Sequence, residues 1–253
     1  MRLLYIKLLP FLLLLTLISC SKKDPKPEQQ GDQKLTKIVN VDLTTGAETA
    51  LWEFTYNQNS QISTIVGGDG RFVLTYDANG KLSGIAKAYN FDNLTSISSF
   101  EYDGKGRPVK QTEVMKYPNS PNVVTTINTF EYDSNNRRTK WVRNSRTYEG
   151  VWSGDNMTEW NITENGLRTY SYKNPLYDNK RNPLYDRADV LEIIGFVWAK
   201  CKNNSLGETT INPDGSTSTS TIDRTYNALG YPTTATFSTA GKVTSKVKYY
   251  YEP

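Results

Sequence analysis

The sequence of 253 residues contains no histidine. Histidine is the most common general base near neutral pH and a frequent metal ligand, so its absence removes whole classes of site. Hydrolases that activate serine or cysteine with histidine are excluded. No recognisable catalytic constellation remains, and we expect no enzyme activity, no metal site and no cofactor. A cell-envelope or glycan-processing enzyme that uses a carboxylate pair stays open as an alternative.

Cysteines are also few, and the chain carries only a small excess of positive charge. The only cysteines are Cys20 and Cys201, and we expect Cys20 to be modified, so the mature chain can form no internal disulfide. Cys201 is expected to be a small buried residue. The formal net charge is +4, of which Arg2 and Lys7 in the N-terminal segment contribute two charges. This near neutrality gives no support for a nucleic-acid partner.

The N-terminal segment has the layout of a signal peptide over residues 1–19. Arg2 and Lys7 precede an almost wholly apolar run over residues 8–18, which is too short for a comfortable membrane span. The run ends in Leu17-Ile18-Ser19-Cys20. These residues resemble a bacterial lipobox, whose cysteine is lipidated and becomes the first residue of the mature protein. An ordinary signal peptide with an incidental cysteine is the alternative.

Residues 20–33 predict a flexible tether, because residues 21–31 are charged, contain proline and lack apolar side chains. By resemblance to bacterial sorting rules, Ser21 favours the outer membrane. Lys23-Asp24 matches only in part the surface-export signal of some Bacteroidota lipoproteins. The domain is therefore expected on either the periplasmic or the cell-surface side of the outer membrane.

The remaining residues, 34–253, are rich in aromatic side chains, with 17 Tyr, 8 Phe and 5 Trp in the whole chain. Trp52, Phe54 and Tyr56 alternate with other residues, and a period of two is typical of a β-strand. Similar runs recur between turn signals along the chain. We predict a single all-β domain: a long antiparallel meander of about sixteen strands that forms a curved sheet or barrel-like roll.

A short motif, Tyr76-Asp77-Ala78-Asn79-Gly80, organises this meander. Variants begin at Tyr56-Asn57, Tyr102-Asp103, Tyr132-Asp133, Tyr177-Asp178 and Tyr226-Asn227. Asp or Asn in such a turn accepts a hydrogen bond from a backbone N–H two residues on, and the Gly position permits positive φ. We interpret these acids as turn formers. Apolar residues six and nine positions after the tyrosine, such as Leu82 and Ile85, indicate either a β-bulge or a sheet covered on both faces.

The meander is interrupted by a proline-rich segment over residues 174–185, which we expect to be a loop. Residues 186–202 follow with apolar side chains at helical spacing, and they predict one short helix near residues 189–201. Gly195 and the β-branched residues weaken this pattern, so a buried strand is the alternative. An apolar helix among hairpins would plug an end of the curved sheet or cover one of its faces.

The repeated pattern resembles the YD hairpin repeat of large bacterial Rhs-type proteins. It consists of Tyr-Asp, two further residues, Gly, then Lys or Arg and an apolar residue. With the lipobox, the hairpin at residues 152–156 and the segment 177–183, the chain resembles an uncharacterised family of Bacteroidota lipoproteins with a porin-like β fold. The resemblance implies an envelope location and a β fold, and it brings no catalytic residues. The runs 122–132 and 137–143 lack a lipid-compatible face, so we expect a barrel or sheet that does not span the membrane.

Three aromatic residues near hairpin ends, Tyr148, Trp152 and Trp160, are the candidate ligand-binding residues, because aromatic rings stack on sugar rings. The alternative is that they fill the interior of the roll. The biochemical function is not specified by the sequence. We expect a cell-envelope lipoprotein held in the membrane by the lipid on Cys20, acting as a structural or ligand-binding module for a glycan, a peptide or an envelope protein.

Overall fold

The computed structural model describes residues 33–252, except residues 69, 90–93 and 119. The predicted signal peptide, Cys20 and nearly all of the predicted tether lie outside the described residues and stay predictions. Among the residues that are described, no helix combines the length and the apolar composition that a membrane crossing requires.

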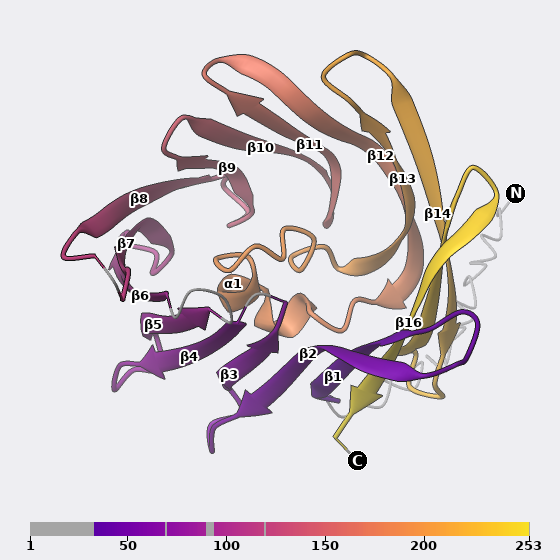
Figure 1. Cartoon of the computed structure of the whole chain (residues 1–253), viewed down its shortest axis with the longest axis horizontal. Helices are drawn as coiled ribbons and strands as arrows, with labels where there is room; N and C mark the ends of the chain where they lie inside the picture. The colour runs from indigo at the N-terminus through magenta and orange to yellow at the C-terminus, as the bar shows by residue number, and fades with distance from the viewer. Residues whose placement is uncertain (1–32, 69, 90–93, 119, 253) are drawn as a thin grey trace, which may run out of the picture. The chain divides into compact units, whose positions relative to one another are not determined.

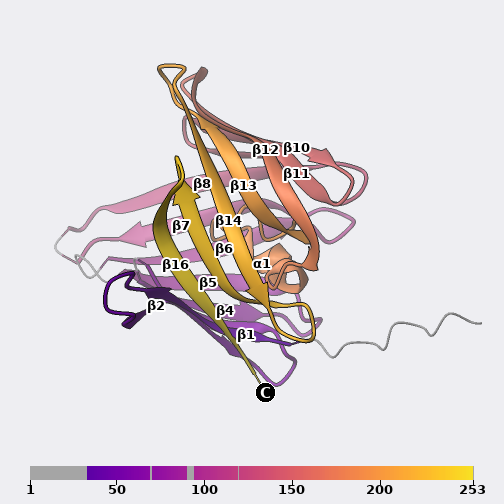
Figure 2. The same cartoon turned by 90° about the vertical axis from the view of Figure 1, so that its right-hand side faces the viewer.

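The domain is a closed barrel of sixteen antiparallel strands (Figure 1). Each strand pairs with its neighbours in sequence, and β1 pairs with β16 to close the ring. Figure 2 turns the wall that contains β12, β13, β14 and β16 toward the reader. The strands are β1 (Leu35–Val41), β2 (Glu48–Tyr56), β3 (Ile62–Gly67), β4 (Gly70–Tyr76), β5 (Leu82–Tyr89), β6 (Thr95–Tyr102), β7 (Pro108–Lys116), β8 (Val123–Tyr132), β9 (Arg138–Arg143), β10 (Arg146–Ser153), β11 (Asn156–Glu164), β12 (Leu167–Arg181), β13 (Asn203–Ile211), β14 (Thr217–Tyr226), β15 (Pro232–Thr239) and β16 (Lys242–Tyr251). The predicted all-β meander is confirmed, and it closes into a barrel.

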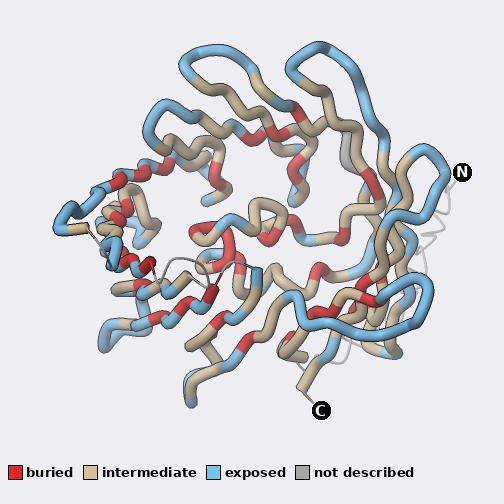
Figure 3. The backbone as a smooth tube through the Cα atoms, in the orientation of Figure 1, coloured by how far each residue is buried: buried red, intermediate tan, exposed pale blue. Residues whose placement is uncertain are grey.

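Side chains alternate between the interior and the outer surface of the barrel. In β4, Phe72 and Leu74 are buried, whereas Arg71 and Val73 are exposed. Figure 3 shows buried stretches along the strands and on the segment inside the ring, and exposed stretches at the hairpin tips. The period of two in the sequence therefore reports which face of each strand points inward.

A β-bulge explains the odd spacing of apolar residues after the tyrosines. The register between β4 and β5 shifts between Thr75 and Tyr76, so one extra residue of β5 is accommodated there. Leu82 and Ile85 are then both buried although they lie three residues apart. The same shift occurs beside the tyrosines at 56, 102, 132 and 226. Of the two alternatives that the spacing left open, the bulge is the one present.

The aspartates of the motif form the turns, as predicted. The Asp77 side chain accepts hydrogen bonds from the backbone N–H of Asn79 at 2.9 Å and of Lys81 at 2.8 Å. Gly80 adopts a positive φ of 77°. The fourth residue after four of the other five tyrosines also has positive φ: Ser60, Gly106, Asn136 and Gly230. The copy at Tyr177-Asp178 differs, because it lies within β12 and forms no such turn. Glycine, which has no Cβ, and residues with short polar side chains suit this left-handed conformation.

The tyrosine of each motif ties its hairpin to the preceding one. Tyr76 donates its hydroxyl hydrogen bond to the Ile62 carbonyl at 2.7 Å, and Tyr132 donates to the Pro108 carbonyl at 2.9 Å. Each acceptor is the first residue of the strand that follows the preceding turn. Seven aromatic donors bond a backbone carbonyl of a preceding segment, and Tyr226 bonds the Asp178 carboxylate of a preceding strand. We call these eight the anchor aromatics: Tyr56, Tyr76, Tyr102, Tyr132, Trp152, Tyr177, Tyr226 and Tyr251.

The residue just before each acceptor often stacks on the same anchor aromatic. The Lys81 ammonium lies 4.5 Å from the centroid of the Tyr102 ring, and the Arg107 guanidinium lies 4.9 Å from that of Tyr132. A cation over an aromatic face is attracted by the ring quadrupole. The Lys or Arg that follows Gly in the motif therefore stacks on the anchor aromatic of the next hairpin. The carbonyl of the residue after it accepts the hydrogen bond from the same anchor aromatic.

Segment 182–202, which we call the plug, lies inside the ring of strands (Figure 1). It contains a 3₁₀ turn, η1 (Tyr185–Arg187), and one short helix, α1 (Ala188–Leu191). The predicted helix is present but ends at Leu191, because the chain continues in turns and Gly195 adopts a φ of 109°, outside the helical region. Asn182 holds the two ends of the plug together by donating its side-chain amide to the Trp198 and Cys201 carbonyls at 3.0 and 2.9 Å.

The prediction that residues 174–185 form a loop is wrong for its first part. β12 extends to Arg181 and pairs with β13 through three irregular steps. The register shifts lie between Lys173 and Leu176, between Leu176 and Tyr177, and between Tyr177 and Arg181, and the strand continues through them.

We predict that Tyr76→Phe lowers the free energy of unfolding by about 1–2 kcal/mol, because the Ile62 carbonyl loses its hydroxyl donor while the ring stays packed. Urea unfolding measures the change. Tyr117→Phe, at an exposed tyrosine outside the anchor set, is the matched control and is expected to change stability by less than about 0.5 kcal/mol. Equal effects of the two substitutions would contradict a structural role for the anchor hydroxyl.

Candidate functional site

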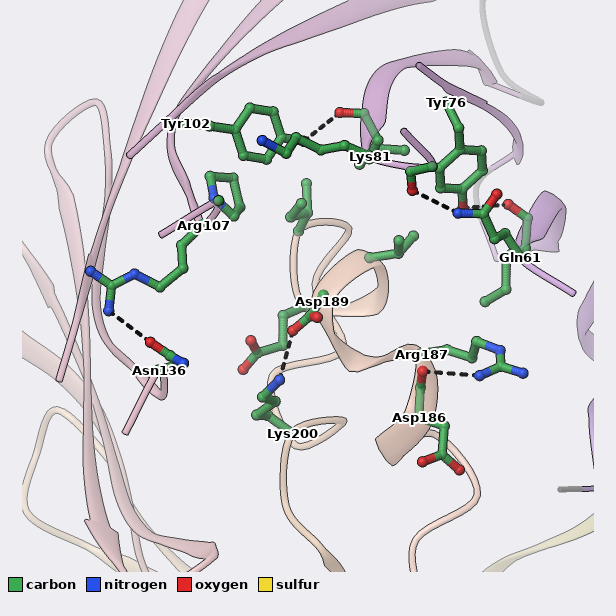
Figure 4. A pocket seen from close by; sticks show the side chains of 18 of the residues that line it. Gln61, Tyr76, Lys81, Tyr102, Arg107, Asn136, Asp186, Arg187, Asp189 and Lys200 are labelled. Atoms are coloured by element: carbon green, nitrogen blue, oxygen red, sulfur yellow. Dashed lines mark hydrogen bonds and ion pairs between the residues drawn. The ribbon is translucent and has the colours of Figure 1, made fainter. Parts of the chain in front are cut away.

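A pocket of about 630 Å³ lies between the plug and the turns of four neighbouring hairpins, β2–β3, β4–β5, β6–β7 and β8–β9. Figure 4 shows Lys81, Tyr102 and Arg107 on the strand side, facing Arg187 and Asp189 of the plug. The volume falls in the range of small-molecule sites, which is about 300–1,000 Å³. The pocket is therefore the candidate functional site of the domain.

The hairpin repeat places the rim of this pocket. Anchor aromatics such as Tyr76 and Tyr102 bond the first residue of a strand in the preceding hairpin, so consecutive turns follow one another around the end of the barrel. Gln61, Lys81 and Arg107 occupy the same position in three such turns, five residues after the anchor tyrosine. The polar side chains that enclose the pocket are thus spaced by the fold itself.

The pocket carries more positive than negative side chains. Its basic residues are Lys81, Lys105, Arg107, Arg138, Arg187 and Lys200, and its acidic residues are Asp186, Asp189 and Glu192. Lys200 pairs with Asp189 at 2.6 Å, and Arg107 pairs with Asp103 of its own turn at 2.6 Å. Within the described part of the chain, Lys81, Lys105 and Arg187 form no ion pair with a carboxylate. The rim is therefore electropositive.

A buried ion pair lies at the inner wall of the pocket. Arg138 is 2% exposed, and its Nη1 donates to the Glu192 backbone carbonyl at 3.0 Å. Its Nη2 lies 3.9 Å from Glu192 Oε1, which is too long for a hydrogen bond. Among the described residues, Arg138 Nε, Arg138 Nη2 and Glu192 Oε1 have no hydrogen-bond partner. Unmade bonds are costly in a buried position, so this pair is a polar part of the pocket wall whose hydrogen bonding is incomplete within the described residues.

Burial raises the pKa of Glu192 to about 7, although Arg138 and Lys200 favour its charged form. The carboxyl group therefore changes charge near neutral pH. Burial likewise raises the pKa of Tyr76 and of Tyr102 to about 12, so these pocket tyrosines stay protonated and donate hydrogen bonds at neutral pH. Their hydroxyls are used by the backbone carbonyls of Ile62 and Leu82.

A second, smaller cavity of about 90 Å³ lies against β4–β9 and the plug. Its wall carries a connected polar network. Gln111 donates to Ser98 and accepts from Asn128, which in turn accepts from the Trp141 indole N–H. These buried groups form hydrogen bonds with one another, so the polar side chains of this network are a structural feature of the barrel interior.

The predicted ligand-binding residues lie together, and none of the three lines the main pocket. Tyr148 stacks on Trp141 with ring centroids 4.3 Å apart and on Trp160 with centroids 5.9 Å apart. Trp160 is only 2% exposed, and Trp152 is an anchor aromatic that donates to the Arg138 carbonyl at 3.0 Å. All three pack in a cluster with Met157 and Cys201. Packing accounts for their position, and a ligand-binding role for them stays a prediction.

Cys201 is buried, and burial raises the pKa of its thiol. This placement agrees with the expected role of a small buried residue. In the described ranges, no group of three or more Cys, Asp or Glu side chains is arranged to hold a metal ion.

The sequence signals only part of the pocket. Lys81 and Arg107 belong to the repeated motif, so their shared position was visible as the basic residue after Gly. Arg138 and Glu192 are 54 residues apart and meet only because the plug turns back into the barrel. No local spacing in the sequence predicts that pair.

Comparison with known proteins shows the fold. No protein-family model matches the sequence, and no curated protein matches it. A porin-like protein from Bacteroides uniformis has a similar structure, with a TM-score of 0.56 and 11% identity over 87% of this chain and 98% of the other. A porin-like protein from Bacteroides vulgatus matches with a TM-score of 0.51 and 15% identity over 88% of this chain and 100% of the other.

The chain thus has the β-barrel fold of these porin-like proteins. At 11% and 15% identity, the likeness concerns the fold alone.

We predict that the Glu192 carboxyl makes stability fall as pH rises from about 4.5 to 7. The folded protein holds the proton more tightly than the unfolded chain, whose glutamates have the ordinary value of 4.5, so the stabilisation is fully present below 4.5 and is lost by the time pH passes 7. A raised pKa of this size corresponds to about 3 kcal/mol. Glu192→Gln should flatten this part of the profile of unfolding free energy against pH.

The control for this experiment is Glu101→Gln, at an exposed acid of the outer wall. It should leave the slope between pH 4.5 and 7 as it is in the unchanged protein. An unchanged slope in Glu192→Gln would contradict the raised pKa of the buried carboxyl.

Proposed function

We propose that this protein is a lipid-anchored module of the bacterial cell envelope that binds a small polar ligand in the pocket at the turn end of its barrel. The observation that carries the proposal is the pocket of about 630 Å³ with an electropositive rim and with Arg138 and Glu192 held in its wall without complete hydrogen bonding. Replacing a buried ion pair with well-packed apolar residues of similar volume is often neutral or stabilising, so stability alone does not account for this pair.

The outer surface of the barrel supports anchoring by lipid instead of membrane insertion. Exposed ion pairs join neighbouring strands, such as Lys37 with Glu53 at 2.9 Å and Lys110 with Glu101 at 2.6 Å. Charged side chains on a lipid-facing barrel wall cost up to about 2–4 kcal/mol each at mid-membrane. The interior is also occupied by the plug. An envelope position therefore depends on the lipobox-like segment that ends at Cys20, in keeping with the porin-like fold.

The geometry favours binding over catalysis by a carboxylate pair. Asp189 is tied to Lys200, and Asp186 is tied to Arg181, each at 2.6 Å. Glu192 is buried beside Arg138. A pair of acids working as nucleophile and general acid needs two side chains that both reach a glycosidic bond. The acids of this pocket are instead engaged with basic partners.

We predict that Cys20→Ala abolishes incorporation of a radiolabelled fatty acid into the protein and releases the protein from the outer-membrane fraction. Cys201→Ala, at the buried thiol of the barrel, is the matched control and should keep both the label and the membrane association. A Cys20→Ala protein that still carries the label would contradict the anchor.

We predict that a thermal-shift screen of saccharides, short peptides and small anions against the full chain finds a compound that raises the melting temperature saturably, since a ligand that binds only the folded form stabilises it. Asp189→Trp, which places a large side chain in the pocket, should remove the shift. Asp155→Trp is the matched control, because Asp155 is also exposed and also pairs with a lysine, but lies outside the pocket. A shift that survives Asp189→Trp would place the ligand elsewhere.

A further inference from the structure

We infer that the pocket takes an acidic saccharide, with the carboxylate of the sugar held by Lys81, Lys105 and Arg187 and the sugar hydroxyls held by side chains of the turns. This inference rests on the proposed function, because it names the ligand class of the same pocket. Three observations lead to it: basic groups without acidic partners, a second guanidinium behind them, and a neutral polar mouth of the right size.

The first observation is the position of the unpaired basic groups. Lys81 is held over the Tyr102 ring at 4.5 Å, and Lys105 lies at the tip of the next turn. Arg187 approaches from the plug, where its guanidinium lies 5.9 Å from the Tyr56 ring. Its Nε is buried and has no hydrogen-bond partner in the described residues. The three groups come from two hairpins and the plug, and all three line the pocket. Figure 4 shows Lys81 on the strand side and Arg187 on the plug.

The second observation is the charge behind them. Arg138 presents an Nε and an Nη2 that make no hydrogen bond, and these two donors form one edge of the guanidinium fork. Glu192, the nearest acid, is held at 3.9 Å and has a raised pKa, so it compensates this charge only in part. A low-dielectric wall beneath the rim strengthens the attraction between this charge and an anion in the pocket.

The third observation distinguishes a sugar acid from a bare anion. The mouth also carries neutral hydrogen-bonding side chains, namely Asn59, Ser60 and Asn136, from two other turns. The volume of about 630 Å³ is far larger than one phosphate or acetate fills. A ligand that uses the whole pocket therefore has a body with several hydroxyl groups in addition to its negative charge.

Calorimetric titration of the full chain tests this inference with three probes: digalacturonate, the neutral disaccharide lactose, and inorganic phosphate. We expect digalacturonate to bind at least about tenfold more tightly than either control, a difference of about 1.4 kcal/mol. Raising the salt concentration should weaken its binding, because exposed charges are screened.

The double variant Lys81→Gln with Lys105→Gln should weaken digalacturonate binding by about tenfold or more. Lys110→Gln with Lys140→Gln removes two charges from the outer wall and is the matched control, expected to bind as the unchanged protein does. The melting temperature of each unliganded variant shows that it is folded. An unchanged affinity for digalacturonate in the Lys81→Gln, Lys105→Gln double variant would overturn the inference.

The remaining outcomes separate the inference from the proposed function. Equal binding of lactose and digalacturonate, removed by Asp189→Trp, would overturn the anionic ligand and keep the pocket as a binding site. Equal binding of phosphate and digalacturonate would overturn the saccharide. If none of the three probes binds, the acidic saccharide is overturned, whereas the proposed function is decided by the wider screen with Asp189→Trp and Asp155→Trp.

Discussion

The hydrogen bond from an anchor aromatic to the backbone of the preceding hairpin is the interaction on which the rest of this structure depends. Tyr76 to Ile62 and Tyr132 to Pro108 are two copies of it. A meander of hairpins has no long-range crossover to fix its curvature, so each hairpin must be positioned against its neighbour. A buried hydroxyl that finds its acceptor only on the adjacent hairpin supplies that position, and repetition around the ring closes the barrel.

The same repeat builds the candidate site. Because the anchor fixes each turn, the residue five positions after the tyrosine points repeatedly to the same end of the barrel, and in Lys81 and Arg107 that residue is basic. The plug then supplies the other wall, with Arg187 and Asp189, and buries Arg138 against Glu192. The pocket thus combines a periodic part, set by the hairpins, and an irregular part that belongs to one segment of the chain.

This division explains what sequence reasoning reached. The strands, the Asp-formed turns and the alternative of a bulge at Leu82 and Ile85 all follow from local spacing, and the structure confirms them. The sequence predicts Trp152 as an aromatic ligand-binding residue, whereas its place in the anchor set depends on the Arg138 carbonyl of another hairpin. The early end of α1 and the Arg138–Glu192 pair depend on how the plug turns inside the barrel, which no local pattern encodes.

Spectrophotometric titration of tyrosinate in the folded protein tests the central claim most directly. Burial raises the pKa of Tyr56, Tyr76 and Tyr102 to about 12, and the pKa values of the other tyrosines in the anchor set are raised further. The account predicts that the anchor tyrosines ionise only well above the ordinary tyrosine pKa of about 10, together with loss of the β-sheet circular dichroism signal. Reversible ionisation of all 17 tyrosines near pH 10 with the fold intact would contradict it.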